Sequence, residues 1–234
     1  MVPRIDMPLT LPYPEALKHE RELLREIAGG DGTPRFIVWR TPQALIVPRG
    51  MPGRANFETA AMNAEARGWP VFERDTGGDL TPQSPGIVNL SLVFRMDSAR
   101  PSIEEAYRRL TRPVLDFLQS EFGLDAITSA IPGAFCDGAY NIAFGGQKLA
   151  GTAQRWRLLL GEGEAKPSAV LAHVALMCTI DLAPAIAMLN AFYRDLGLDR
   201  HVELARHVTL EELVGPEAAT PEKVAGALEM FLKG

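Results

Sequence analysis

The feature of this sequence that most constrains its fold is a glycine-rich stretch, residues 133–157, that contains a clear β-hairpin signal. Residues 140–144 alternate in polarity in the manner of a strand, and the pair Gly145-Gly146 is typical of a two-residue hairpin turn. The residues from Lys148 onward are predicted to form the returning strand. Because a hairpin brings residues that are distant in the sequence side by side, Cys136 and Lys148 are expected to meet at one site.

The rest of the chain alternates between helix and strand patterns. A capping box, Ser102 with Glu105, precedes an apolar stripe and predicts the longest helix, which Pro113 should kink or divide. Asn56 is predicted to cap an earlier helix. Helices are predicted over residues 14–28, 57–67, 102–122, 182–196, 209–214 and 221–232, and further strands over residues 35–40, 44–47, 69–74, 87–95 and 169–177.

Short turns join most of these strands, and one more is predicted at residues 161–164. This arrangement favours an α+β fold, in which helices flank a mixed, mainly antiparallel β-sheet. Residues 1–198 are predicted to form the main domain and residues 199–234 a short helical C-terminal appendage.

Composition limits the class of protein. With 47% hydrophobic and 23% charged residues, the 234-residue chain has the makeup of a globular protein with a large core. Its net charge of −5 and its lack of a long basic run argue against nucleic acid as a partner. No apolar run reaches about 18 residues, so no membrane contact is expected and the predicted location is cytoplasmic. The sequence has no metal, nucleotide-loop or serine-hydrolase motif.

Two residues of the glycine-rich stretch are candidates for catalysis. Cys136 lies in a loop between Gly133 and Gly138, and is either a reactive thiol or the inert buried thiol that is common in intracellular proteins. Lys148 follows a glycine pair at the start of a strand, where small residues let a ligand approach the backbone. Cys178 lies in an apolar run and is predicted to belong to the core.

Three motifs, in order, resemble the biotin/lipoate protein ligase and lipoyltransferase superfamily. Residues 73–78, Glu-Arg-Asp-Thr-Gly-Gly, are similar to the family's Arg-Arg-x-Ser-Gly-Gly-Gly, and residues 86–91, Gly-Ile-Val-Asn-Leu-Ser, are similar to its Gly-x-x-Asn-x-Ser. Residues 147–155, Gln-Lys-Leu-Ala-Gly-Thr-Ala-Gln-Arg, are similar to its Gly-Arg-Lys-Ile-Ser-Gly-Ser-Ala. His173 falls where the family often has a histidine, although on the sequence alone it is a core residue or a pocket wall. The resemblance covers about residues 10–200 and implies the family's catalytic-domain fold.

Within the superfamily, Cys136 with Lys148 is most similar to the cysteine-dependent octanoyl/lipoyl relay amidotransferases. The resemblance implies an octanoyl/lipoyl-protein transferase that forms a thioester on Cys136, uses Lys148 as acid and base and needs no cofactor. Implied partners are lipoyl-domain proteins such as the glycine-cleavage H protein and the acyltransferase subunits of 2-oxoacid dehydrogenases. The implied substrate-binding residues are Arg74, Thr76, Gly77, Gly78, Asn89, Ser91, Gly138, Gly151, Thr152, Gln154 and His173.

Some of these residues have more specific implied roles. Gly77, Gly78 and Asn89 are expected to line an acyl tunnel, and the backbone amides near Gly151 and Thr152 are expected to stabilise an oxyanion.

Departures from the family pattern leave other functions open. Glu73 replaces the first arginine of the motif and Asp79 replaces its third glycine, where an acidic side chain would repel a nucleotide phosphate. The second hypothesis is an ATP-dependent lipoate or octanoate ligase, in which Lys148 binds the acyl-adenylate and Cys136 is incidental. The third is a non-catalytic module that binds a lipoyl domain or a small acid.

Overall fold

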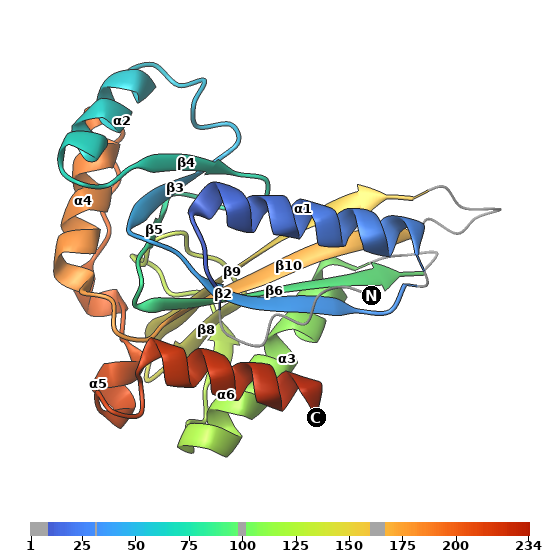
Figure 1. Ribbon diagram of the computed structural model, residues 1–234. Helices are drawn as coiled ribbons and strands as arrows, with labels where there is room; N and C mark the ends of the chain where they lie inside the picture. The colour runs from blue at the N-terminus through green and yellow to red at the C-terminus, as the bar shows by residue number, and fades with distance from the viewer. Residues whose placement is uncertain (1–8, 31, 98–101, 160–166) are drawn as a thin grey trace.

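The computed structural model describes residues 9–30, 32–97, 102–159 and 167–234, which are built around a seven-stranded β-sheet (Figure 1). In order across the sheet, its strands are β1 (Leu9–Thr10), β2 (Arg35–Arg40), β6 (Ile87–Met96), β10 (Ser168–Met177), β9 (Gln147–Leu158), β8 (Asn141–Phe144) and β7 (Ile127–Ser129). Only the β1–β2 pair is parallel. The predicted α+β class is confirmed. The turn predicted at residues 161–164 lies outside the described residues.

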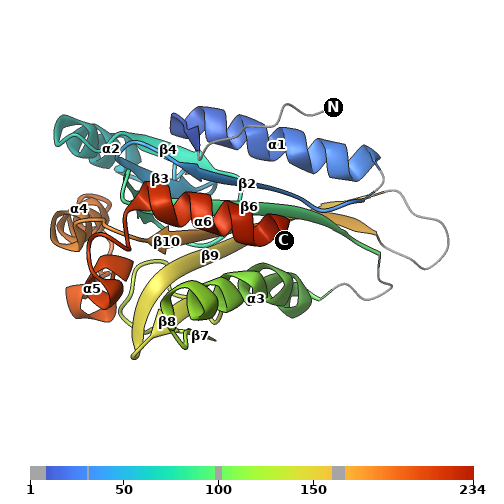
Figure 2. The same cartoon turned by 60° about the horizontal axis from the view of Figure 1, so that its bottom comes forward.

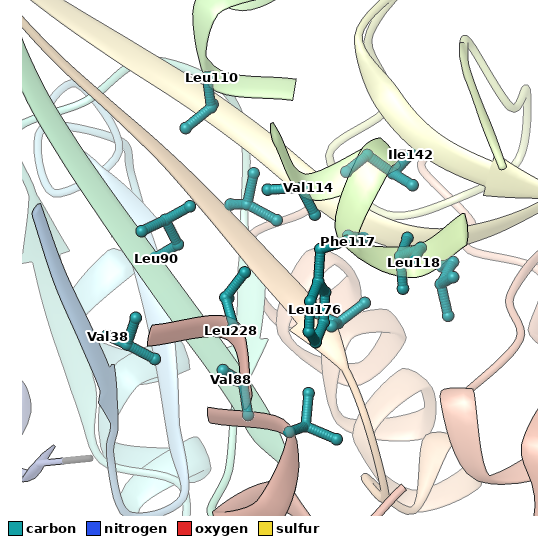
Figure 3. Close-up of a cluster of buried hydrophobic side chains, with 14 of the residues drawn as sticks. Val38, Val88, Leu90, Leu110, Val114, Phe117, Leu118, Ile142, Leu176 and Leu228 are labelled. Atoms are coloured by element: carbon teal, nitrogen blue, oxygen red, sulfur yellow. The ribbon is translucent and has the colours of Figure 1, made fainter. Parts of the chain in front are cut away.

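Helices cover both faces of this sheet. α3 (Ile103–Phe122) and α6 (Pro221–Lys233) pack on one face, and α1 (Tyr13–Gly29) lies across the other (Figure 2). Successive residues of β6 divide between the two faces, as predicted, because strand side chains alternate. Val88 and Leu90 join the core cluster beneath α3 and α6 (Figure 3). Asn89 and Ser91 point to the face of α1, so the polar side chains of the strand are gathered on one side.

A second, three-stranded sheet stands beside the main one. Its order is β4 (Val71–Arg74), β3 (Ala44–Pro48) and β5 (Thr81–Gln83). The sequence predicts a single sheet without β5, which is only three residues long and contains Pro82. Proline is tolerated there because β5 is an edge strand. α2 (Phe57–Ala66) packs against α4 (Leu182–Asp195) at this end of the molecule.

The predicted hairpin is present. β8 and β9 are antiparallel and are joined at Gly145 and Gly146, whose φ angles are +57° and +79°. Positive φ at both turn residues is the geometry that favours glycine in a two-residue hairpin.

The C-terminal residues pack into the main core. After a 3-10 turn (Leu204–Arg206), α5 (Leu210–Val214) and α6 contribute side chains to the cluster beneath α3, among them Leu210, Val224 and Leu228. The division at residue 198 stays a prediction, but the hydrophobic core is continuous across it.

Two local predictions are only partly met. Pro113 does not divide α3, which continues through it as one helix of 20 residues, and the alternative of a kink stays a prediction. Asn56 occupies the N-cap position of α2, but its side chain makes no capping hydrogen bond because its φ of +64° is left-handed. The Ser102 cap of α3 is confirmed, since its side chain accepts the Glu105 N–H.

Candidate active site

A small cavity lies where the α1 face of the main sheet meets the three-stranded sheet. Its volume is about 30 Å³, room for about two water molecules, so a longer ligand requires the surrounding side chains to move. The wall is mostly apolar, with Tyr13, Trp39, Ile46, Pro82, Ile87, Phe135, Ala153, Ala175 and Met177. The other lining residues are Arg74, Thr81, Gln83, Asn89, Cys136, Gly151, Thr152 and His173.

Cys136 reaches this cavity from the loop between β7 and β8. Its φ is +42°, a left-handed conformation that is rare for a residue with a side chain. The following residue holds the loop together, because the Asp137 carboxylate accepts the Ile131 N–H at 2.6 Å and the Asn141 amide at 3.0 Å. The loop therefore fixes the thiol in a strained backbone conformation, which is common at functional sites.

The sulfur of Cys136 is surrounded by positive charge and by a hydrogen-bond donor. It accepts the Asp79 N–H at 3.1 Å, and the Arg74 Nη2 atom lies 3.5 Å away. Burial acts to raise the pKa of the thiol, but Arg74, Lys148 and the Asp79 N–H together outweigh burial and hold the pKa below its ordinary value. A lowered pKa increases the fraction of thiolate, the nucleophilic form.

Lys148 is fully buried beside the cysteine loop. Its Nζ atom donates to the Phe135 carbonyl at 2.6 Å and to the Cys136 carbonyl at 3.1 Å, and lies 4.4 Å from the centre of the Phe135 ring. Burial lowers the pKa of Lys148 to about 8, near the range in which a group can exchange protons at neutral pH. The hairpin thus brings the two predicted residues into one site, although among the described residues Lys148 bonds to the backbone of Cys136 rather than to its sulfur.

Arg74 connects the small sheet to the thiol. Its Nη1 donates to the Thr81 hydroxyl at 3.1 Å and its Nη2 to the Asp79 carbonyl at 2.7 Å. The Nε atom is buried and has no partner among the described residues. Because a buried donor without a partner is costly, this N–H is available to an oxygen atom of a ligand in the cavity.

His207 is not among the predicted site residues, yet it packs against the cysteine loop. Its Nε2 accepts the Phe135 N–H at 3.1 Å, its Nδ1 lies 3.0 Å from the Glu203 carbonyl, and its ring stacks on Phe135. Nε2 accepts a hydrogen bond, so Nδ1 carries the proton. Both backbone polar groups of Phe135 are therefore paired: His207 accepts its N–H, and Lys148 donates to its C=O. No local motif marks His207, because it is 72 residues from Phe135.

A second set of buried polar side chains lies on the α1 face of the sheet. The Ser91 hydroxyl donates to Glu20 at 2.5 Å and accepts the Trp39 N–H at 2.9 Å. Glu20 lies 3.5 Å from His173, whose other ring nitrogen is 3.4 Å from the Thr76 hydroxyl. This network ties three predicted residues, Ser91, His173 and Thr76, to the unpredicted Glu20.

Asn89 is paired separately. Its side-chain amide exchanges two hydrogen bonds with the amide of Gln83 in β5, at 2.9 and 3.1 Å.

The predicted glycines have unequal roles. Gly78 has a φ of +106°, and a Cβ there would lie 2.5 Å from Arg74 and 2.7 Å from the Cys136 sulfur. A Cβ on Gly151 would meet the Lys148 side chain at 3.4 Å. Gly77 and Gly138 have no atom within 4 Å of an added Cβ.

Several predicted positions lie outside the cavity wall. Of the predicted tunnel residues, Asn89 lines the cavity, whereas Gly77 and Gly78 do not. Gly138 is exposed, and the Gln154 amide donates instead to the Ile103 carbonyl at the start of α3. Gly151 and Thr152 do line the cavity.

The site is thus built from a thiol, two cationic side chains and an apolar cavity. In the part of the chain that the structure describes, no group of three or more His, Cys, Asp or Glu side chains could hold a metal ion. Among the same residues, no helix combines the length and the apolar character needed to cross a membrane. A thiolate beside hydrogen-bond donors at an apolar cavity is suited to acyl transfer, in which the thiol carries the acyl group.

Comparisons with known proteins place this chain in a family. Residues 12–231 match the model of the lipoyl protein ligase A/B catalytic domain. The chain belongs to this family, and it is an acyltransferase-type enzyme of lipoyl or octanoyl transfer.

Two relatives are similar over most of the chain. An uncharacterised protein of Cupriavidus necator is 35% identical over 82% of this chain and 81% of its own length. An octanoyl-GcvH:protein N-octanoyltransferase of Kyrpidia tusciae is 32% identical over 90% of this chain and 72% of its own length. Among solved structures, a putative lipoate protein ligase of Thermoplasma acidophilum with bound lipoic acid superposes with a TM-score of 0.68. The match covers 98% of this chain and 84% of that one at 20% sequence identity. This likeness supports the fold.

Proposed function

We propose that this protein moves an octanoyl or lipoyl group from an acyl-carrying protein onto a lysine of a lipoyl domain, through a thioester on Cys136. The observation that carries the proposal is the setting of the sulfur: it accepts the Asp79 N–H at 3.1 Å, lies 3.5 Å from Arg74 Nη2 and faces an apolar cavity. The relative from Kyrpidia tusciae is named for the same transfer from GcvH.

In the first step, the Cys136 thiolate attacks the carbonyl carbon of the acyl-lysine amide on the donor. A C–S bond forms and the C–N bond breaks, so the departing lysine amine needs a proton. Lys148 supplies that proton and becomes neutral, which its lowered pKa of about 8 allows near neutral pH.

In the second step, the lysine amine of the acceptor attacks the thioester. The new C–N bond forms, the C–S bond breaks, and Cys136 leaves as a thiolate. The attacking amine gives its proton to neutral Lys148, which restores the starting protonation of the site. The enzyme therefore consumes no ATP and needs no cofactor.

Both steps pass through a tetrahedral intermediate with an oxyanion, and we propose Arg74 as its main donor. Arg74 lines the same cavity as Cys136, and its buried Nε–H has no partner among the described residues. The backbone near Gly151 and Thr152 also lines this cavity and is a second candidate. Opening the cavity to an acyl chain would bury methylene groups, each worth about 0.8 kcal/mol of binding free energy.

The test is to incubate the protein with an octanoylated lipoyl domain, without ATP, and to measure adducts and products by intact mass. We expect a hydroxylamine-sensitive octanoyl adduct on the wild type and octanoyl transfer to a second lipoyl domain. Cys136→Ala should lose both, and Cys178→Ala is the matched control, because Cys178 is buried in the core away from the cavity. Full transfer by Cys136→Ala would refute the thioester mechanism.

The same assay separates the other candidate functions. Acylation that requires free octanoate and ATP and releases pyrophosphate would identify a ligase. The Asp79 carboxylate, which is paired with Arg200, argues against a bound phosphate at this loop. Binding of a lipoyl domain without any turnover would identify a non-catalytic module.

A further inference from the structure

Positive charge outside the site gathers in a hollow of about 370 Å³ that is lined by residues of α1 and β9 together with Arg49 and Asp75. We call it the arginine hollow. Its lining contains five arginines and one acidic residue, a local charge of +4 on a chain whose net charge is −5. It is lined by Arg21, Leu24, Arg25, Arg49, Asp75, Arg155, Trp156 and Arg157.

A buried carboxylate organises this cluster. Asp75 accepts hydrogen bonds from Arg21 Nε at 2.7 Å and Arg49 Nη2 at 2.8 Å, and pairs with Arg155 Nη1 at 2.6 Å. The hydrogen bond from Arg21 is the main reason that the pKa of Asp75 is lowered, so the carboxylate is ionised at neutral pH.

These pairs use only part of each guanidinium. The side chain of Asp75 is 6% exposed, whereas the side chains of Arg21 and Arg49 are 51% and 66% exposed. A guanidinium has five N–H donors, so donors on these arginines still face solvent. Glu73, 3.6 Å from Arg49, offsets part of the charge at one edge.

The arginine hollow adjoins the candidate active site along two elements. On β9, Gly151, Thr152 and Ala153 line the cavity, and residues 155–157 of the same strand line the hollow. At the end of β4, Arg74 lines the cavity and the next residue, Asp75, lies in the hollow. A protein that extends an acyl-lysine into the cavity must therefore cover the surface beside it.

We propose that the arginine hollow docks an acidic face of the lipoyl domain that carries or receives the acyl group. This inference rests on the proposed function, and it adds the surface that recognises the protein part of the substrate. Complementary charges across an interface mainly accelerate association and orient the partners. Binding through this surface should therefore weaken as salt concentration rises.

The test uses the double variant R25E/R157E. Both side chains are exposed and line the hollow, and neither is among the three arginines that hold Asp75. The matched control is Arg112→Glu, an exposed arginine on α3, which packs on the opposite face of the sheet. For transfer from an octanoylated acidic lipoyl domain at low salt, we expect kcat/KM to fall about tenfold or more in the double variant, with kcat nearly unchanged. The loss should shrink at high salt, and the control should behave like the wild type.

A second measurement isolates docking from chemistry. Acylation of Cys136 by octanoyl-pantetheine, a small thioester, should proceed at the wild-type rate in R25E/R157E, since no protein partner is involved. Equal losses with the small and the protein donor would overturn the docking proposal, as would an unchanged kcat/KM with the protein donor. A third outcome would also overturn the docking proposal. If the wild type binds millimolar inorganic pyrophosphate, the double variant does not, and neither shows salt-dependent binding of the lipoyl domain, the hollow is a site for a small anion.

The two proposals can fail separately. Fluorescence anisotropy of a labelled lipoyl domain reports docking even for Cys136→Ala, which cannot form the thioester. The lipoyl domain should bind Cys136→Ala in a salt-dependent manner, and adding R25E/R157E to that variant should abolish the binding. This result would support docking at the arginine hollow whatever the outcome of the transfer assay.

Discussion

At the scale of single residues, the site depends on how closely three groups approach the Cys136 sulfur. The Asp79 N–H and Arg74 lie against it, and Gly78 passes so near that an added Cβ would come within 2.7 Å of the sulfur. Asp79 stands where the family motif has a third glycine, yet its backbone supplies a hydrogen bond to the sulfur. Its side chain pairs with Arg200 and accepts the Leu80 N–H at 2.7 Å, which holds the loop in place. The substitution is therefore compatible with a role for this loop at the thiol.

Alanine substitutions at Gly78 and Gly77 form a matched pair that tests this close contact between the loop and the Cys136 sulfur. In Gly78→Ala, the Cβ would meet Arg74 at 2.5 Å and would occupy a left-handed φ of +106°, so the loop must shift away from the sulfur. We expect the thiol pKa to rise and transfer activity to fall by at least about tenfold, a barrier change of about 1.4 kcal/mol. Iodoacetamide alkylation across a pH series measures the pKa. Gly77→Ala has open space and should retain activity, and equal effects of the two substitutions would contradict this account.

At the scale of elements, the β8–β9 hairpin and the segment before α5 together hold the cysteine loop. Lys148, the second residue of β9, donates to the Phe135 carbonyl, while its own carbonyl accepts the Val208 N–H at 3.0 Å. His207, the residue before Val208, holds the Phe135 N–H. The loop is thus fixed by two segments that are adjacent in space but about 60 residues apart in sequence.

His207 should contribute to the pH dependence of stability. Burial lowers its pKa from 6.5 to about 4. The unfolded chain therefore binds a proton below about pH 6.5, whereas the folded protein does so only near pH 4. The free energy of unfolding should decrease as pH falls through this window.

The variant His207→Phe keeps a stacking ring but lacks the titration, so it should lose less stability between pH 6.5 and 4 than the wild type. At pH 7 it leaves the Phe135 N–H unpaired, at a cost of about 1–3 kcal/mol. Urea unfolding at several pH values measures both effects. His201→Phe, at an exposed position, is the control. If the two variants show the same pH dependence, His207 does not act in this way.

At the scale of the whole molecule, one core joins the C-terminal helices α5 and α6 to the α3 face of the main sheet. Leu228 of α6 is 2% exposed and lies in the same cluster as Val88 and Leu90 of β6 (Figure 3). The residues after 198 also carry His207 to the cysteine loop. They therefore support the site as well as the core.

Alanine substitutions in α6 should lower the free energy of unfolding at a buried position but not at an exposed one. Leu228→Ala removes a buried side chain and should lower the free energy of unfolding by about 2–5 kcal/mol. Met230→Ala, two residues away and 70% exposed, should change it by less than about 0.5 kcal/mol. Chemical denaturation followed by far-UV circular dichroism provides the comparison. A small effect of Leu228→Ala would mean that α6 is dispensable to the core.

The sequence by itself determined the elements whose signals are local. The glycine pair of the hairpin, the alternation along β6 and the Ser102 cap each rest on a few neighbouring residues, and each is present in the structure. The hairpin likewise predicted that Lys148 lies beside Cys136, and the Lys148 Nζ atom donates to the Cys136 carbonyl.

The tertiary structure decided which groups surround the thiol. Arg74, Asp79 and His207 come from segments up to 72 residues away from the cysteine loop, and no local pattern records such contacts. The edge strand β5 and the three-stranded sheet were also beyond prediction, because three residues with a proline carry too little periodicity. Only tertiary packing gives Cys136 its lowered pKa, through Arg74, Lys148 and the Asp79 N–H, and gives Lys148 its complete burial. Both depend on charge and solvent exclusion in three dimensions.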